Sequence, residues 1–323
     1  MPKDFSHLHV HSIYSLLDGS NKIDKLCERV KELGMTSIAI TDHGVMSGCV
    51  EFYKQCKKNS VKPILGIEAY ITDDEDGVPK ENRHRDNNHL VMVAMNNEGY
   101  ENLLFMSSNA ALNNFYYKPR ISKTTLAKHS KGIIATSACL GNECNRKACW
   151  IPEDKRYEDP NKDVRKAAAW YKEVFQGRYY LEIQDNDDKA GQQAAYNSFI
   201  MGIGKELDIP MVITSDAHYL HKEDKDTHDM LMAMQLKQTL TQYKDPSNTF
   251  QYGPWFYIRS GDEMYEAAKK YNCSQAFENT LVIASQCNLE LELGKYKPPT
   301  FPIDQVEDRK EFEEWLKHRH EED

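Results

Sequence analysis

The sequence has no apolar stretch long enough to cross a membrane. A bilayer-spanning helix needs about 20 consecutive apolar residues, and no stretch of the 323 residues comes near that length. The N-terminal sequence MPKDFSHLHVHS also lacks the features of a secretory signal peptide. We therefore expect a soluble, cytoplasmic protein that makes no contact with a membrane.

Positive charge is also scarce, since 41 Lys and Arg stand against 50 Asp and Glu, which gives a net charge of −9. This balance argues against a protein that wraps duplex DNA on a basic face. It does not exclude a nucleic-acid enzyme whose local positive charge comes from bound metal. The eight cysteines show no CxxC spacing, so reduced thiols or metal ligands are favoured over disulfides.

Several catalytic motifs are missing. No GxGxxG or GxxxxGK[ST] follows the first expected strand, which removes the main support for a nucleotide-binding doubly wound fold. No GxSxG is present either, so the serine nucleophile typical of hydrolases has no candidate. The chemistry must be sought in other side chains.

Apolar, β-branched runs alternate with amphipathic helical patterns along most of the chain. The runs predict seven strands, at residues 5–11, 37–41, 63–71, 89–95, 132–139, 179–184 and 210–219. Helices are expected between most of them, the first with Ser20 as its N-cap and Gly34 at its end. Such βα units form either a doubly wound sheet or a closed barrel. We favour an α/β fold, a seven-stranded (β/α)7 TIM-like barrel.

Two segments interrupt this alternation in ways that bear on domain organisation. Residues 72–88 are a charged loop without apolar anchors, and KPPTFP at 297–302 resembles a linker. The last residues, 306–323, predict a charged helix without a partner. We expect one domain over 1–290, followed by a linker and charged helical tail over 291–323 that leads toward a missing region.

Side chains able to bind metal collect where the expected strands end, and sites in βα barrels form at the carboxyl ends of strands. The donors comprise five histidines, three carboxylates and one cysteine: His9, His11, Asp18, His43, Glu68, His89, Cys139, Asp216 and His218. In HxH, residues i and i+2 share one face of a strand, so His9 and His11 can bind one ion. His89 fits poorly because it opens its strand; either that strand is reversed or the residue belongs to the preceding loop.

Each donor also has an ordinary structural interpretation. A lone histidine at a strand end is more often a surface residue, Asp42 and Asp216 can cap helices, and Cys139 can be a small core residue. Separate HxH, DH and DxH patterns at successive strand ends are much harder to reach by chance. Together they favour a metal site.

The number and type of donors indicate which metals and which chemistry to expect. A zinc site takes about four donors, so nine suit two or three ions. Imidazole, carboxylate and thiolate together favour divalent zinc, manganese or iron over magnesium or calcium. Such ions lower the pKa of bound water to about 7 and stabilise both oxygens of an in-line displacement. Phosphoester hydrolysis is the reaction that this donor set suits best.

These residues also carry a resemblance to a known family. The matching segments are SHLHVHSIYSLLDG (6–19), AITDHGVMSGCVEFYK (39–54), KPILGIEAYI (62–71), NHLVMVAMNNEGYENL (88–103), YYKPRI (116–121), TSACLGNE (136–143), YYLEIQD (179–185) and ITSDAHYL (213–220). They resemble the PHP (polymerase and histidinol phosphatase) domain. Within that family they are most similar to the N-terminal part of bacterial DNA polymerase III alpha subunits.

The resemblance implies a distorted seven-stranded barrel that holds three metal ions. It places one ion on His9, His11, Glu68 and Asp216, a second on Glu68, His89 and Cys139, and a third on Asp18, His43 and His218. His7 and Asp42 are expected to support the ligands from the second layer of residues. Some alpha subunits have several ligands replaced, whereas every ligand position here has a competent donor.

The resemblance further implies a metal-dependent 3′–5′ exonuclease of the proofreading type that acts on a single-stranded or frayed DNA 3′ end. The polymerase palm of the family lies beyond this sequence, so we expect no polymerisation. Partners would be the rest of the polymerase, a sliding clamp or a proofreading subunit. Two alternatives stay open: an inactive scaffold that docks partners, and a phosphomonoesterase of the histidinol-phosphatase type.

A few basic and aromatic side chains are candidates for contacting the substrate. Lys118, Arg120 and Arg83 or Arg85 are candidates for binding backbone phosphates, although solvated loop charge explains them at least as well. Tyr116 and Tyr117 are candidates for stacking a base, and core packing is the alternative for both.

Overall fold

The computed structural model describes residues 3–148, 160–186, 191–248, 251–296 and 307–319. By its internal contacts the chain divides into two units, residues 1–290 and residues 291–323. The second unit contains helix α12 (Glu307–Arg319). No helix in the described parts of the chain combines the length and the apolar character needed to cross a bilayer.

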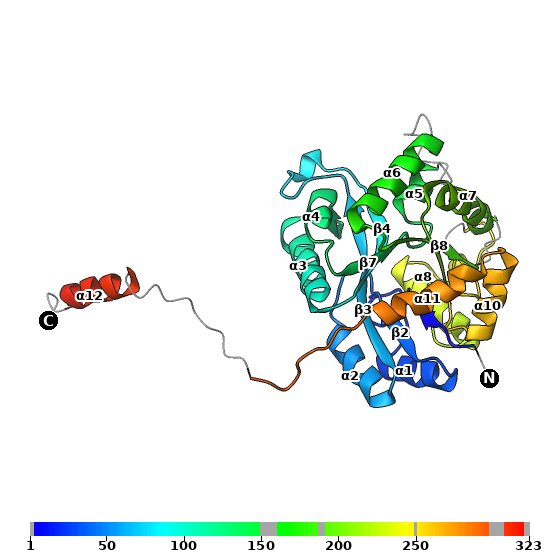
Figure 1. Ribbon diagram of the computed structural model, residues 1–323, viewed down its shortest axis with the longest axis horizontal. Coiled ribbons are helices and arrows are strands. Elements are labelled where there is room, and N and C mark those ends of the chain that lie inside the picture. Colours follow the sequence, from blue (N-terminus) through cyan, green and yellow to red (C-terminus); the bar gives the residue numbers. More distant parts are fainter. Residues whose placement is uncertain (1–2, 149–159, 187–190, 249–250, 297–306, 320–323) are drawn as a thin grey trace. The chain divides into compact units, whose positions relative to one another are not determined.

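Seven strands form the wall of a nearly closed barrel in the first unit, in the order β1-β2-β3-β4-β7-β8-β9 (Figure 1). They are β1 (Ser6–His7), β2 (Ser37–Ile40), β3 (Lys62–Thr72), β4 (Asn88–Ala94), β7 (Ile133–Thr136), β8 (Tyr179–Gln184) and β9 (Met211–Thr214). Beyond β1 and β9 the wall closes through a parallel bridge between Val10 and Ala217. The His11 amide donates to the Ala217 carbonyl at 2.8 Å, and the Ala217 amide donates to the His9 carbonyl at 3.1 Å. The predicted seven-stranded barrel is confirmed.

Strand β4 departs from the all-parallel pattern, because it pairs antiparallel with both β3 and β7. The segment between β3 and β4 contains only the short 3-10 turn η1 (Lys80–Asn82), with no crossover helix. Parallel neighbours need such a crossover, whereas antiparallel neighbours do not. The reversal places His89, the second residue of β4, opposite Tyr70 near the end of β3. His89 therefore reaches the carboxyl end of the barrel from a strand that starts there.

Helices surround the strands in Figure 1. Their bounds are α1 (Ile23–Glu32), α2 (Cys49–Asn59), α3 (Asn97–Asn113), α4 (Lys123–Lys128), α5 (Glu143–Lys147), α6 (Pro160–Phe175), α7 (Gln192–Leu207), η2 (Lys222–Asp224), α8 (Lys225–Gln235), α9 (Leu240–Tyr243), α10 (Gly261–Lys270) and α11 (Ser274–Gln286). Two short strands, β5 (Phe115–Tyr116) and β6 (Lys118–Ser122), form a hairpin, and β6 also pairs with β3.

The prediction that Ser20 caps the first helix is wrong. Helix α1 begins at Ile23 and its N-cap position is Lys22, which makes no side-chain capping bond. The Ser20 amide instead donates to the His218 carbonyl at 2.7 Å, and its hydroxyl donates to the same carbonyl at 3.2 Å. Tertiary hydrogen bonding to the segment that follows β9 thus takes the place of a local cap.

Apolar side chains fill the barrel below the strand ends. One cluster takes a residue from each strand or its immediate continuation, together with three residues of or next to α11: Leu8, Ala39, Ile64, Val93, Ile134, Tyr180, Val212, Ile283, Ala284 and Cys287. Residues two or four further along a strand lie on the same face. The face of β3 that buries Ile64 therefore also presents Glu68, whereas Asp216 follows the end of β9 by two residues and has a φ of 50°. The packed core thus fixes where Glu68 points, and the turn after β9 sets the direction of Asp216.

Two helical glycines provide a test of this packing. A Cβ at Gly99 of α3 would lie 1.8 Å from the Gly132 carbonyl oxygen, whereas a Cβ at Gly202 of α7 would meet nothing within 4 Å. Gly99→Ala should lower the free energy of unfolding by about 1–3 kcal/mol through overpacking. Gly202→Ala should raise it by about 0.5–1 kcal/mol, as expected of alanine in an open helix position. Urea unfolding of both variants measures these effects, and stabilisation by Gly99→Ala would contradict the observed helix–loop contact.

Candidate metal centre

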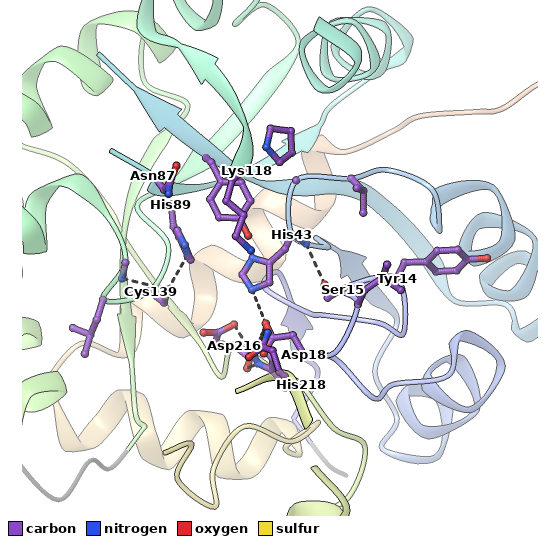
Figure 2. Close-up of a pocket in the computed structure, with 18 of the residues that line it drawn as sticks. Tyr14, Ser15, Asp18, His43, Asn87, His89, Lys118, Cys139, Asp216 and His218 are labelled. Atoms are coloured by element: carbon purple, nitrogen blue, oxygen red, sulfur yellow. Dashed lines mark hydrogen bonds and ion pairs between the residues drawn. The ribbon is translucent and has the colours of Figure 1, made fainter. Parts of the chain in front are cut away.

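All nine predicted metal donors lie together at the carboxyl end of the barrel. Six of them line one cavity: Asp18, His43, His89, Cys139, Asp216 and His218. The other three, His9, His11 and Glu68, are fully buried directly beside them. Figure 2 shows His43 in the middle, with His89 and Cys139 to its left and Asp18 and His218 below it.

Glu68 is the centre of this cluster. Its Oε2 lies 3.3 Å from His9 Nε2, 3.2 Å from His11 Nε2 and 2.8 Å from His43 Nδ1. Its Oε1 accepts a hydrogen bond from His89 Nδ1 at 2.9 Å, and the Cys139 Sγ lies 3.7 Å from the same oxygen. One carboxylate therefore faces four imidazoles and a thiol.

Two aspartates continue the cluster on either side of the paired histidines. Asp216 Oδ1 lies 3.1 Å from His9 Nε2 and 3.2 Å from His11 Nε2. Asp18 Oδ2 lies 2.8 Å from His43 Nε2 and 3.5 Å from His218 Nε2. Because both nitrogens of His43 face carboxylates, this ring links the Glu68 group to the Asp18 group.

Five buried atoms at the middle of the cluster have no hydrogen-bond partner among the described residues. They are His9 Nε2, His11 Nε2, His43 Nδ1, Glu68 Oε2 and Asp216 Oδ1. Buried polar atoms are rarely left unpaired, and each such atom costs about 1–3 kcal/mol. Donors that each lie about 2.0–2.2 Å from one ion are themselves about 3–4 Å apart. The spacing of these atoms therefore fits a metal ion.

Hydrogen bonds on the far side of two rings strengthen this conclusion. His9 Nδ1 donates to Glu182 at 2.8 Å, and His11 Nδ1 donates to the Ser15 hydroxyl at 2.9 Å. Ser15 in turn donates to Asp42 at 2.7 Å, so its oxygen is free to accept from His11. A neutral imidazole that donates through Nδ1 has a lone pair on Nε2. Both lone pairs face the Glu68 and Asp216 carboxylates, an arrangement that is repulsive without a cation between them.

The electrostatics without metal follow from the same contacts. Burial by itself would raise the pKa of Glu68, but the surrounding His89, His43 and His9 hold it well below its usual range. Burial would likewise lower the pKa of His43, but Glu68 and Asp18 outweigh this effect and raise it to about 10. The pKa of His9 is raised in the same way by Asp216, Glu182 and Glu68. Without metal, His9 and His43 therefore take up protons that compensate the buried carboxylates.

Sequence reasoning missed Glu182, which supports the cluster from inside the barrel. It is 1% exposed and accepts hydrogen bonds from Thr136, from Thr214 at 2.5 Å and from Gln184 at 2.8 Å, besides that from His9. A carboxylate that accepts a hydrogen bond from the other ring nitrogen fixes the tautomer and orientation of a metal-ligating histidine. Its position could have been noticed in the sequence, because a glutamate is unusual within a strand as apolar as YYLEIQ.

His228 and Tyr252 were also missed, because the sequence after residue 220 predicts only irregular helices. The Tyr252 hydroxyl donates to Asp18 Oδ1 at 3.2 Å and lies 3.2 Å from His218 Nε2. His228 Nε2 donates to the Asp18 carbonyl at 2.8 Å. Burial lowers the pKa of His228 to about 3, which makes it a neutral support for the Asp18 loop.

The two residues expected to support the ligands lie at different distances from the cluster. Asp42 binds Ser12 and Ser15, and through Ser15 it orients His11. His7 is fully buried, contacts the Arg259 carbonyl at 2.8 Å and lies 3.1 Å from the Ser215 hydroxyl. It therefore touches the residue before Asp216 instead of a predicted ligand.

Of the four predicted phosphate contacts, Arg120 requires correction. Its side chain is fully buried and its guanidinium pairs with Asp74 at 3.1 Å and with the His84 carbonyl at 2.7 Å, so it holds the 72–88 loop. Arg83 is engaged similarly, with the carbonyls of Val78 and Phe115. The other two are exposed: Arg85 lies over the Tyr117 ring, and Lys118 lines the cavity above the cluster.

Several curated proteins are similar to this chain over most of its length. The DNA polymerase III subunit alpha of Helicobacter pylori is 42% identical over 305 residues, covering 93% of this chain and 24% of the relative. Those of Campylobacter jejuni (39% over 299 residues; 92% and 24%) and Deinococcus radiodurans (38% over 317 residues; 94% and 22%) are similar. The chain spans about a quarter of the length of these curated relatives.

A solved two-domain protein from Bacteroides vulgatus, described as containing a predicted PHP-like metal-dependent phosphoesterase, matches at 12% identity and a TM-score of 0.39. The match covers 92% of this chain and 75% of that one. A model of the PHP domain matches residues 7–186. Because this segment is more than half of the sequence, the chain belongs to the PHP domain family.

Proposed function

We propose that this chain is a metal-dependent phosphoesterase that removes nucleotides from the 3′ end of DNA. The observation that carries the proposal is the group of five buried donor atoms around Glu68 and Asp216 that face one another without a hydrogen bond among the described residues. Divalent ions, when bound there, supply a water of lowered pKa and charge compensation for phosphoryl oxygens. The choice of DNA rests on the polymerase relatives and on the cavity above the donors, whose volume is about 1130 Å³.

The donors divide into three sets that would each hold one ion. His9, His11, Glu68 and Asp216 form the first set, and Glu68 extends it to His89 and Cys139. Asp18, His43 and His218 form the third, next to the Tyr252 hydroxyl. A thiol among imidazoles and carboxylates favours zinc, iron or manganese over magnesium or calcium. We expect two to three ions per chain.

The protein's own groups prepare this site for a phosphodiester. Glu182 and Ser15 hold His9 and His11 with Nε2 facing inward, and His228 holds the Asp18 backbone. Preorganised donors of this kind need no rearrangement when charge develops on the substrate. In a longer polymerase, the activity would serve proofreading beside a sliding clamp or another proofreading subunit.

Direct assays separate this proposal from its two rivals. The purified chain, incubated with Mn²⁺ or Zn²⁺, should shorten single-stranded DNA from its 3′ end. A label at the 5′ end of the DNA makes the shortened products visible. Hydrolysis of a phosphomonoester alone would favour the histidinol-phosphatase type. Stable folding with neither bound metal nor any hydrolysis would favour a scaffold.

Loss of one ligand of the first set should weaken metal binding there and lower turnover. His9→Ala should release metal, which elemental analysis measures, and should lower cleavage at least about a hundredfold. Losing only the hydrogen-bond partner of a ligand costs up to about a hundredfold, and losing the ligand itself should cost no less. His129→Ala is the matched control, because His129 lies outside the cluster against Phe105 and Asn102. Equal metal content in His9→Ala and the unmodified protein would contradict the assignment.

Metal binding should release protons, because the raised pKa values of His9 and His43 keep both rings protonated at pH 7 without metal. A bound imidazole is neutral, so each displaced proton makes the apparent metal affinity rise about tenfold per pH unit while the pH stays below the metal-free pKa. Calorimetry of Zn²⁺ binding at pH 7 in buffers of different ionisation enthalpy measures the release. A binding enthalpy independent of the buffer would refute it.

Glu182→Gln tests the support of His9. The amide still accepts the hydrogen bond but has no charge to make His9 a stronger ligand, so metal affinity should fall about 10–100-fold. Competition with a chromophoric chelator measures this change, with Glu98→Gln, in an exposed ion pair with Lys131, as the control. An unchanged affinity in a folded Glu182→Gln protein would remove Glu182 from the site.

A further inference from the structure

The turn of the β5–β6 hairpin contains an unusual backbone conformation. Tyr117 is the single residue between the two strands, which pair Phe115 with Pro119 and Tyr116 with Lys118. Its φ is 61°, in the left-handed region. Glycine and asparagine adopt this region readily, whereas a bulky side chain is disfavoured there. Local folding alone would not select tyrosine at this position.

The side chain of Tyr117 is also placed where an aromatic ring is not needed for packing. It is 65% exposed and lines the cavity above the metal donors. The Arg85 guanidinium carbon lies 5.3 Å from its ring centroid, and the Tyr116 ring packs against its edge at 4.7 Å. Strained residues that contribute little to the core tend to mark binding sites.

Lys118, the next residue, connects this ring to the cluster. Its Nζ lies 5.2 Å from the centroid of the Tyr70 ring, which in turn lies 5.2 Å from the His89 ring and 5.9 Å from the His43 ring. Figure 2 shows Lys118 reaching into the cavity beside His89. The hairpin therefore presents an aromatic face and then a cation on the way to the donors.

Apart from the predicted metal ligands, the charged side chains that line the cavity are positive. Among the described lining residues, the charged side chains other than the predicted ligands are Lys118 and Arg146. Arg146 donates to the Asn87 carbonyl at 3.4 Å, and its buried Nε has no hydrogen-bond partner among the described residues. Two positive side chains lining the same cavity are notable in a chain whose net charge is −9. Such a lining fits a polyanion that extends beyond the reacting phosphate.

We propose that Tyr117, Lys118 and Arg146 form a binding site for single-stranded DNA that leads its 3′ end to the metal cluster. The Tyr117 ring stacks on a base upstream of the scissile bond, and the two cations bind backbone phosphates. An aromatic face combined with positive charge is how proteins bind single strands without sequence preference. This inference rests on the proposed function and deepens it by naming the strand contacts, which a phosphomonoester could not use.

Tyr117→Gly separates binding from folding. The substitution relieves the backbone conformation, so the variant should be at least as stable as the unmodified protein. Its affinity for a 5′-fluorescein-labelled oligothymidylate, measured by fluorescence anisotropy with the full chain, should fall by between about fivefold and a hundredfold. Tyr117→Phe should retain the affinity, since its ring stacks equally well. Unchanged affinity in Tyr117→Gly overturns the inference.

Matched variants address the cations. Lys118→Ala and Arg146→Ala should weaken binding and reduce its dependence on salt, because each removes one phosphate contact. Lys131→Ala makes the same change of charge at an exposed residue that does not line the cavity, and Tyr296→Gly removes an exposed tyrosine elsewhere. Equal losses in the controls would show non-specific attraction and contradict the proposed site.

A second substrate keeps the two proposals distinguishable. Bis(p-nitrophenyl) phosphate has no upstream nucleotides, so Tyr117→Gly should hydrolyse it at the unmodified rate while losing activity on the oligonucleotide. If neither substrate is hydrolysed by the unmodified protein, the hydrolase proposal fails, and anisotropy still decides whether Tyr117 binds the strand. If both activities fall together in Tyr117→Gly, the residue supports the cluster and the strand-binding role is wrong.

Discussion

A carboxylate buried within β3 sets the chemical requirement of the whole site. Glu68 is fully buried and faces His9, His11, His43 and His89 within hydrogen-bonding or ion-pairing distance. Removing a carboxylate from water costs several kcal/mol unless positive charge and hydrogen bonds compensate it. Protons on the imidazoles or metal ions among them are the two ways to meet this requirement. The Nδ1 hydrogen bonds of His9 and His11 favour the metal.

The barrel closure and the reversal of β4 bring the donors to this carboxylate. Hydrogen bonds between the backbones of His9, His11 and Ala217 join the first and last strands, and they set His9 and His11 beside Asp216. The antiparallel β4 begins at the carboxyl end of the barrel and contributes His89. The scaffold places the donors, and their own hydrogen bonds then orient them.

The sequence indicated which side chains gather at the carboxyl end of the barrel, but it revealed little of what surrounds them. HxH, DH and DxH patterns after buried strands indicated metal ligands because local spacing and strand ends are written in the chain. Glu182 and Tyr252 left no comparable signal, since each reaches the site through contacts with residues distant in sequence. Arg120 looked like a phosphate contact because the sequence does not show that Asp74 folds back onto it.

Hydrophobic periodicity by itself determined the seven strands, and the order of metal-capable residues along them indicated the chemistry. Both depend on residues close together in the chain, where pattern and propensity act directly. Only the tertiary structure decided the direction of β4, the backbone contacts that replace a cap at Ser20, and the inward face of Glu182. These depend on which distant groups satisfy buried polar atoms, and that is settled only when the barrel closes.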